Sequence, residues 1–189
     1  MNIAIVGDSF SSDSMQSSWI SLLEQTHKIK NYSARGISQY RLYKILIDNF
    51  IDISAADCVI LFHTNPDRIF IPDHINYTTR ELQSHPYCDM LANDACNSQW
   101  SEIAKTYYKY FFDTKMQQTF YQLLVNEINQ KLSSLDVVNC SGFDAITTGI
   151  DSLVSFADIR QQYPGDINHF SIHGNTIACD RINQQLEQL

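Results

Sequence analysis

Two segments of the sequence combine residue types that can carry out nucleophilic catalysis. Ser9 lies in Gly-Asp-Ser directly after an apolar run, and Asp166 stands three residues before His169. A His that is held by a carboxylate at Nδ1 can take the proton of a serine hydroxyl through Nε2, which makes that serine a nucleophile. The alternative is that Gly, Asp and Ser form an ordinary turn. His173 is a second candidate base, although no Asp stands three residues before it.

Two further positions could donate hydrogen bonds to an oxyanion. Asn65 follows the apolar run from Cys58 to Phe62, and a side-chain amide at the end of a strand can donate to developing negative charge. Gly36 follows a more polar run, and its backbone N–H could serve the same oxygen. Both also have a purely structural interpretation, since Asn can cap a helix or begin a turn before Pro66, and Gly often adopts a left-handed turn.

Alternating strands and helices are the elements that must position these residues. Short apolar runs predict strands over residues 2–6, 57–62, 135–140 and 153–156, with a weaker, more polar strand at 28–32. Helical spacing of apolar residues predicts helices over 14–27, 38–50, 114–132 and 171–189. In the helix at 114–132 the predicted apolar stripe comprises Met116, Phe120, Leu123, Leu124, Ile128 and Leu132. This alternation indicates an α/β fold, a three-layer α/β/α sandwich with a short parallel sheet.

All the candidate residues fall at one end of such a sheet. Ser9, Gly36 and Asn65 follow the first, second and third strands, and His169 precedes the last helix. The carboxyl ends of the strands are where open α/β sheets bind ligands. This arrangement resembles the SGNH hydrolase superfamily, also called the GDSL-like esterases and lipases, whose four name-giving residues correspond to Ser9, Gly36, Asn65 and His169. The Asp-x-x-His signature of the family corresponds to Asp166 and His169.

The resemblance implies a flavodoxin-like SGNH fold and a serine esterase that needs no metal or organic cofactor. Ser9 would be the nucleophile, His169 its base, and Asp166 the residue that orients the base. The backbone N–H groups of Ser9 and Gly36 and the amide of Asn65 would form the oxyanion hole. The expected substrate is an ester, with an acetyl-like O-acyl group on a small molecule or glycan.

Three residues depart from the usual pattern of the family. Phe10 stands where Leu is common, His63 where the third segment usually begins with Gly, and Pro66 where Asp usually follows the Asn. His63 and Pro66 favour an alternative function, a non-catalytic glycan-binding module. A phosphate or flavin site of the flavodoxin type at Ser9–Ser14 is a further alternative, although the sequence has no Gly-rich phosphate loop.

Residues from about 72 to 112 are too many for an ordinary connection. They predict an insertion, a partly helical cap above the sheet, within one domain that spans 1–189. Its aromatic residues either contact the substrate or form a local core. The residues expected to bind substrate are His63, Arg68, Tyr87 and Trp100. The sequence disfavours zinc, because the spacing of the nearby candidates fits no compact ligand pattern: His74, His85, Cys88 and Cys96.

The composition limits the partners of the chain. Its 189 residues are 44% hydrophobic and carry a net charge of −8, which suits a globular domain and disfavours nucleic acid and anionic lipid. No apolar run approaches the roughly 20 residues that span a bilayer, and the sequence starts without a secretory pattern. The five cysteines are scattered and odd in number, which favours free thiols. We therefore expect a cytoplasmic protein; the sequence does not indicate its oligomeric state.

Overall fold

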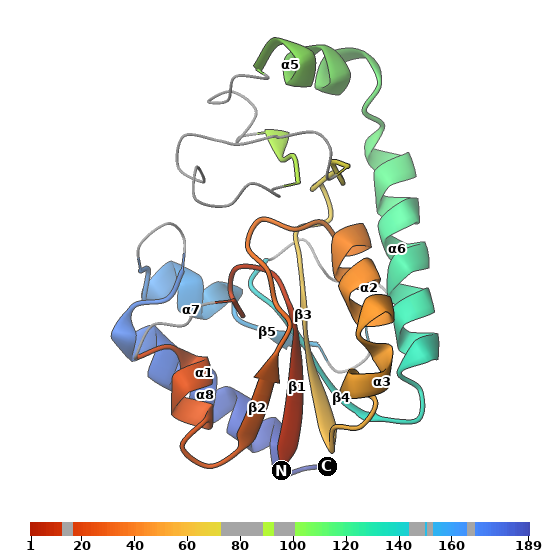
Figure 1. The fold of residues 1–189 in the computed structure, drawn as a ribbon. Coiled ribbons are helices and arrows are strands. Elements are labelled where there is room, and N and C mark those ends of the chain that lie inside the picture. Colours follow the sequence, from red (N-terminus) through yellow and green to blue (C-terminus); the bar gives the residue numbers. More distant parts are fainter. Residues whose placement is uncertain (13–16, 73–88, 93–100, 144–149, 151–152, 166–168) are drawn as a thin grey trace.

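A computed structural model of the chain describes residues 1–12, 17–72, 89–92, 101–143, 150, 153–165 and 169–189. Its strands form one five-stranded sheet in the order β2-β1-β3-β4-β5, and every neighbouring pair is parallel (Figure 1). The strands are β1 (Asn2–Gly7), β2 (Lys28–Asn31), β3 (Cys58–His63), β4 (Asp136–Ser141) and β5 (Val154–Ser155). This strand order is that of flavodoxin-like folds, and it confirms the predicted fold class.

Helices cover both faces of the sheet (Figure 1). One face carries α1 (Trp19–Leu23), α7 (Ala157–Gln162) and α8 (Ile172–Leu186). The other carries α2 (Gln39–Asp48), α3 (Phe50–Ile53) and α6 (Thr114–Lys131). A further helix, α5 (Ser101–Tyr110), belongs to the predicted insertion and lies beyond the carboxyl ends of the strands. Within the described ranges, no helix has both the length and the apolar character that crossing a membrane requires.

The core divides into two layers because alternate residues of a strand point to opposite faces. Ile3 and Ile5 of β1 pack in the cluster that includes α1 and α8, whereas Ala4 and Val6 pack with α2 and α6. All six residues of β3 are buried. A central strand that is covered on both faces explains the uninterrupted apolar run that begins at Cys58.

Polar side chains set the starts of the two helices nearest the candidate residues. The Ser38 hydroxyl accepts a hydrogen bond from the Arg41 N–H at 3.3 Å at the start of α2. The Ser171 hydroxyl accepts from the Gly174 N–H at 3.2 Å at the start of α8. Each cap satisfies a backbone donor that the first turn of a helix leaves unpaired. The caps therefore fix where the chain leaves the loops that follow Gly36 and His169.

The predicted stripe of the long helix is wrong in its first half. Met116, Phe120 and Leu123 are exposed, although Leu124, Ile128 and Leu132 are buried as expected. The buried face instead begins with Tyr121 and Val125, which pack with Phe143 and Leu153. The predicted and the observed stripe both have helical spacing. The observed one is buried because the loop that contains Phe143 packs against it. The helix predicted over 14–27 is also shorter than expected, since α1 begins at Trp19.

Candidate functional site

Ser9 lies in a tight loop after β1, which we call the Ser9 loop (residues 8–12). The Asp8 carboxylate accepts a hydrogen bond from the Phe10 N–H at 3.0 Å, and the Asp8 carbonyl accepts from the Ser11 N–H at 3.1 Å. Ser9 itself is partly exposed, whereas its neighbours on both sides are buried. The loop is thus fixed around Ser9, which solvent can reach.

Gly36 lies in the loop after β2, which we call the Gly36 loop (residues 32–38). Its φ of 67° is in the left-handed region, where residues with a Cβ are strained. The Ala34 N–H donates to the Gly7 carbonyl at 3.0 Å, so this loop runs beside the end of β1. The Gly36 loop therefore starts beside Gly7, the residue after which the Ser9 loop begins.

Asn65 lies in the loop after β3, which we call the Asn65 loop (residues 64–68). The Asn65 side-chain oxygen accepts from the Asp67 N–H at 2.8 Å, so the amide nitrogen is the end that can donate to a ligand. The Thr64 hydroxyl donates to the Ile37 carbonyl at 2.8 Å. This contact joins the Asn65 loop to the Gly36 loop.

His169 lies just before α8, and its imidazole packs against the ring of Phe10. The two ring centroids are 5.5 Å apart with an interplanar angle of 34°. Phe10 directly follows Ser9, so the chain brings the candidate base to the residue beside the candidate nucleophile. Asp166, the predicted orienting carboxylate, lies outside the described residues, and its role stays a prediction.

Trp19 and Asn175 join the Ser9 loop to the start of α8. The Trp19 indole N–H donates to the Phe10 carbonyl at 2.8 Å, and the Trp19 backbone N–H donates to the Asn175 side-chain oxygen at 3.0 Å. The Asn175 amide nitrogen in turn donates to the Phe170 carbonyl at 3.3 Å. This buried chain of hydrogen bonds fixes the two loops relative to each other.

Asp8 is a buried acid beside Ser9. Burial raises the pKa of its carboxyl from 3.8 to about 7, although the Phe10 N–H, the positive charge of Arg68 and the Thr64 hydroxyl all oppose the rise. Desolvation disfavours the charged form, which is why it outweighs these partners. Near neutral pH both the protonated and the ionised form of Asp8 are therefore present.

His63 is completely buried at the end of β3, contrary to its expected position in contact with a substrate. Its Nδ1 lies 3.0 Å from the Gln39 amide nitrogen and its Nε2 lies 3.1 Å from the Asn139 side-chain oxygen. These partners assign the proton to Nε2. Burial lowers the pKa of His63 to about 4, so the ring stays neutral. Its bulk lies inside the fold, and we do not include it among the substrate contacts proposed below.

The other predicted residues fall in different places. The Arg68 guanidinium donates to the Gly36 and Asp89 carbonyls at 3.3 and 2.9 Å, at the rim of the site. His173 lies exposed on α8, with its ring 4.9 Å from that of Tyr163. The remaining candidates lie outside the described residues: Tyr87, Trp100, and the disfavoured zinc ligands His74, His85, Cys88 and Cys96.

A small pocket lies between the start of α2, the Asn65 loop and α6. Its volume is about 110 Å³, and its lining includes Gln39, Arg68, Phe70 and Tyr121. The Tyr121 hydroxyl is buried and has no hydrogen-bond partner. The pocket is connected to a candidate oxyanion donor through its lining residue Arg68, whose guanidinium donates to the Gly36 carbonyl at 3.3 Å.

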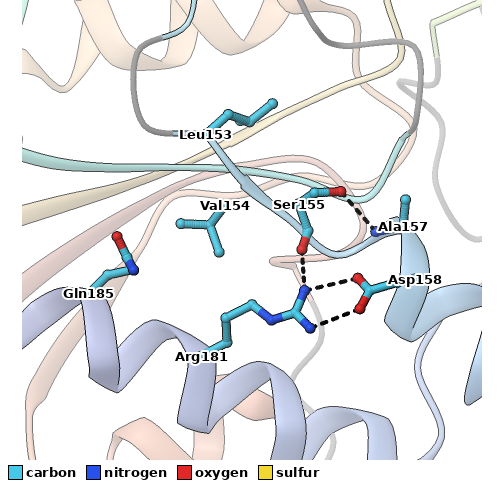
Figure 2. Close-up of a pocket in the computed structure, with 7 residues that line it drawn as sticks. All are labelled: Leu153, Val154, Ser155, Ala157, Asp158, Arg181 and Gln185. Atoms are coloured by element: carbon cyan, nitrogen blue, oxygen red, sulfur yellow. Dashed lines mark hydrogen bonds and ion pairs between the residues drawn. The ribbon is translucent and has the colours of Figure 1, made fainter.

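A larger hollow is lined by none of these residues. It has a volume of about 680 Å³ and is lined by residues of β5, α7 and α8 (Figure 2). The Arg181 guanidinium binds both carboxylate oxygens of Asp158 at 2.9 Å and also donates to the Ser155 carbonyl. Its lining includes none of the candidate nucleophiles and bases that the sequence indicates. Size alone therefore does not make it the active site.

Several residues of the site have no signal in the sequence. Asp89 lies in the insertion and contacts the Gly36 loop, and Arg41 pairs with its carboxylate at 2.9 Å. In the sequence, nothing distinguishes Trp19 and Asn175 from other residues on the apolar faces of their helices. Each of these residues contacts a partner far away in the sequence. The spacing of residues within one segment does not reveal such contacts.

Comparison with solved structures gives the same architecture. The psychrotrophic esterase EstA from Pseudoalteromonas sp., in a structure inhibited by monoethylphosphonate, is 14% identical over 99% of this chain and 97% of that one, with a TM-score of 0.52. The lipase Lip_vut3 from a goat rumen metagenome is 11% identical over 98% and 97% of the two chains, with a TM-score of 0.51. No protein-family model and no curated protein matches the sequence. The structural likeness confirms the predicted α/β fold with a parallel sheet.

Proposed function

We propose that this chain is a serine esterase of the SGNH type that removes an acetyl-like acyl group from a small molecule or a glycan. The contact between Phe10 and His169 carries the proposal, because it brings the base to the residue beside Ser9. The hydrogen bonds that join the Ser9, Gly36 and Asn65 loops support it further, since they gather the oxyanion donors at the same end of the sheet.

In the first half of the reaction, the Ser9 hydroxyl attacks the carbonyl carbon of the ester and His169 takes its proton. Asp166 would hold the tautomer of His169 that leaves Nε2 able to accept. The carbonyl oxygen becomes an oxyanion, which accepts from the N–H groups of Ser9 and Gly36 and from the Asn65 amide. When the tetrahedral intermediate collapses, the bond to the alcohol oxygen breaks and His169 gives its proton to that oxygen.

In the second half, water replaces the alcohol. His169 takes a proton from the water molecule, whose oxygen attacks the acyl carbon on Ser9. The same donors hold the second oxyanion. Collapse breaks the bond to the Ser9 oxygen, which receives the proton from His169, and the carboxylic acid leaves. The enzyme returns to its starting state with no cofactor consumed.

The small pocket supports a short acyl group. Its volume of about 110 Å³ is well below the several hundred Å³ that sites for drug-sized ligands occupy. A pocket of this size beside Ser38 suits an acetyl-like group and excludes a long fatty chain. The alcohol part would then extend outward, toward the segments that follow Arg68.

The test is the hydrolysis of 4-nitrophenyl acetate by the wild-type chain, by Ser9→Ala and by the control Ser12→Ala. The Ser12 hydroxyl belongs to the same loop and donates to the Ser9 carbonyl at 3.4 Å. We expect turnover in the wild type and in Ser12→Ala, and none above background in Ser9→Ala. A wild type that binds acylated sugars but hydrolyses no ester would instead indicate the non-catalytic module.

A further inference from the structure

Asp89 is a buried carboxylate in the inserted segment, and three groups from other segments donate hydrogen bonds to it. Its side chain is completely buried. Its oxygens accept from the Ser38 N–H at 2.7 Å, from the Ile71 N–H at 2.9 Å and from the Arg41 guanidinium at 2.9 Å. Removing a carboxylate from water is unfavourable unless the charge is paired and hydrogen-bonded, and here both conditions hold. The side chain therefore fixes this part of the insertion to the start of α2.

The backbone of Asp89 contacts Gly36. The Asp89 N–H donates to the Gly36 carbonyl at 2.8 Å. The Arg68 guanidinium donates to that carbonyl at 3.3 Å and to the Asp89 carbonyl at 2.9 Å. The Gly36 carbonyl thus accepts two hydrogen bonds, one from the Asp89 N–H and one from Arg68. Arg68 also binds the Asp89 carbonyl, so it connects Gly36 and Asp89.

The backbone of Gly36 needs these hydrogen bonds to hold one conformation, because glycine is the most flexible residue type. It lacks a Cβ and has a φ of 67°, so its backbone has many alternative conformations of similar energy. The Asp89 N–H and Arg68 hold its carbonyl, while the Thr64 hydroxyl holds the next carbonyl, that of Ile37. The Gly36 N–H belongs to the preceding peptide, between residues 35 and 36. The chain is held on one side of that peptide by the Gly36 carbonyl and on the other by the Ala34 N–H, which donates to the Gly7 carbonyl at 3.0 Å. Rotation of the Gly36 N–H is therefore restricted.

We propose that Asp89 is a positioning residue of the oxyanion hole. Its carboxylate anchors the inserted segment, and the anchored backbone holds the Gly36 carbonyl. This restricts the preceding peptide, so that its Gly36 N–H points at the developing charge. The inference rests on the proposed function, because that function makes Gly36 an oxyanion donor. Donors that are already oriented stabilise a transition state without reorganisation, whereas small displacements of catalytic groups can lower the rate by about 10²-fold.

The first test compares Asp89→Asn with the control Asp158→Asn in 4-nitrophenyl acetate hydrolysis. Asp158 also binds an arginine through both oxygens, but it does so at the larger hollow, whose lining includes no candidate site residue (Figure 2). We expect Asp89→Asn to lower kcat by about 10- to 100-fold with KM unchanged within about twofold. Asp158→Asn should leave both constants unchanged. A normal kcat in folded Asp89→Asn, or a change in KM alone, overturns the proposal.

A second variant covers the case in which Asp89→Asn does not fold. Arg41→Lys keeps the positive charge beside Asp89 but loses the forked contact of the guanidinium. We expect a smaller loss of kcat, again with KM unchanged and with a thermal midpoint close to that of the wild type. Full activity in Arg41→Lys would contradict a positioning role of Asp89.

An NMR measurement separates this inference from the proposed function. With carbonyl-¹³C glycine and ¹⁵N isoleucine, a carbonyl–amide correlation selects only the Gly-Ile pairs of the sequence, Gly36–Ile37 and Gly149–Ile150. Gly36→Ala assigns the first signal, and the second is an internal reference. We expect the Gly36 carbonyl shift to move in Asp89→Asn while the reference stays in place. An unmoved Gly36 signal overturns the proposal even if the enzyme is active. If the wild type hydrolyses no ester, the proposed function fails and this signal alone decides whether Asp89 holds the peptide.

Discussion

The ring of Phe10 lies against the imidazole of His169, with 5.5 Å between the two centroids. The same ring is 5.3 Å from that of Phe170 and 5.9 Å from that of Phe62, centroid to centroid. Phe10 therefore connects the residue after Ser9 to the loop that carries the base and to the core strand β3. It stands where the resemblance leads one to expect Leu, whose side chain has no aromatic face to offer an imidazole.

Replacing this ring tests its role. Phe10→Leu should lower kcat for 4-nitrophenyl acetate by up to about tenfold, since an aromatic pair contributes about 0.5–1.5 kcal/mol beyond its buried area. KM should change little, because the ring contacts the base rather than the substrate. Phe50→Leu, a partly buried position on the opposite face of the sheet, is the matched control. Equal kinetics for the two variants would show that the contact does not position His169.

Asn65 should contribute as an oxyanion donor. Asn65→Ala is expected to lower kcat by roughly 10²–10³-fold, the usual cost of one lost donor, with little effect on ground-state binding. Asn126→Ala on the exposed side of α6 serves as the control. Steady-state kinetics measure both. A rise in KM equal to the loss of kcat/KM would make Asn65 a residue that shapes the pocket.

The two histidines near the start of α8 should differ sharply. His169→Gln should lower turnover by about 10²–10⁴-fold, the usual contribution of a general base. His173→Gln should leave turnover intact, because that ring is exposed and packs on Tyr163. The reverse pattern in the same assay would make His173 the base.

Asp8 should make the chain less stable as the pH rises. Its folded pKa is about 7 against an ordinary value of 3.8, so between these values the folded state holds a proton that the unfolded state has lost. The stabilising contribution is therefore complete below about pH 4 and is lost as the pH rises through 7. A pKa difference of that size corresponds to about 4 kcal/mol.

Urea unfolding at pH 4 and pH 8 measures the effect. In the wild type the free energy of unfolding should be lower at pH 8 than at pH 4. In Asp8→Asn this decrease should be smaller by up to about 4 kcal/mol, because the amide does not titrate. The amide keeps an acceptor for the Phe10 N–H, so the loop should persist. Parallel pH dependence in the two proteins would show that Asp8 titrates normally.

Local signals account for what could be predicted from the sequence. The apolar run of β3 predicts a strand covered on both faces, and a polar residue after each strand predicts a site at the carboxyl ends. Ser9, Gly36, Asn65 and His169 are predicted in this way because each follows or precedes a recognisable element. Their grouping then follows from the parallel sheet.

Long-range contacts account for what could not be predicted. Asp89 has no local pattern, and it matters because folding brings it to Gly36. The burial of His63 depends on Gln39 and Asn139, which lie on two other elements. The buried face of α6 depends on which of two stripes meets the loop near Phe143. In all these cases packing, rather than sequence spacing, decides the outcome.

Labelling with a fluorophosphonate tests the central claim most directly, because only an activated serine reacts quickly with it. The account predicts one adduct per wild-type chain by intact mass, located at Ser9 by peptide mapping, with Ser9→Ala unlabelled and Ser12→Ala labelled at the wild-type rate. No adduct on the wild-type protein, or labelling of Ser9→Ala at an equal rate, would contradict the account.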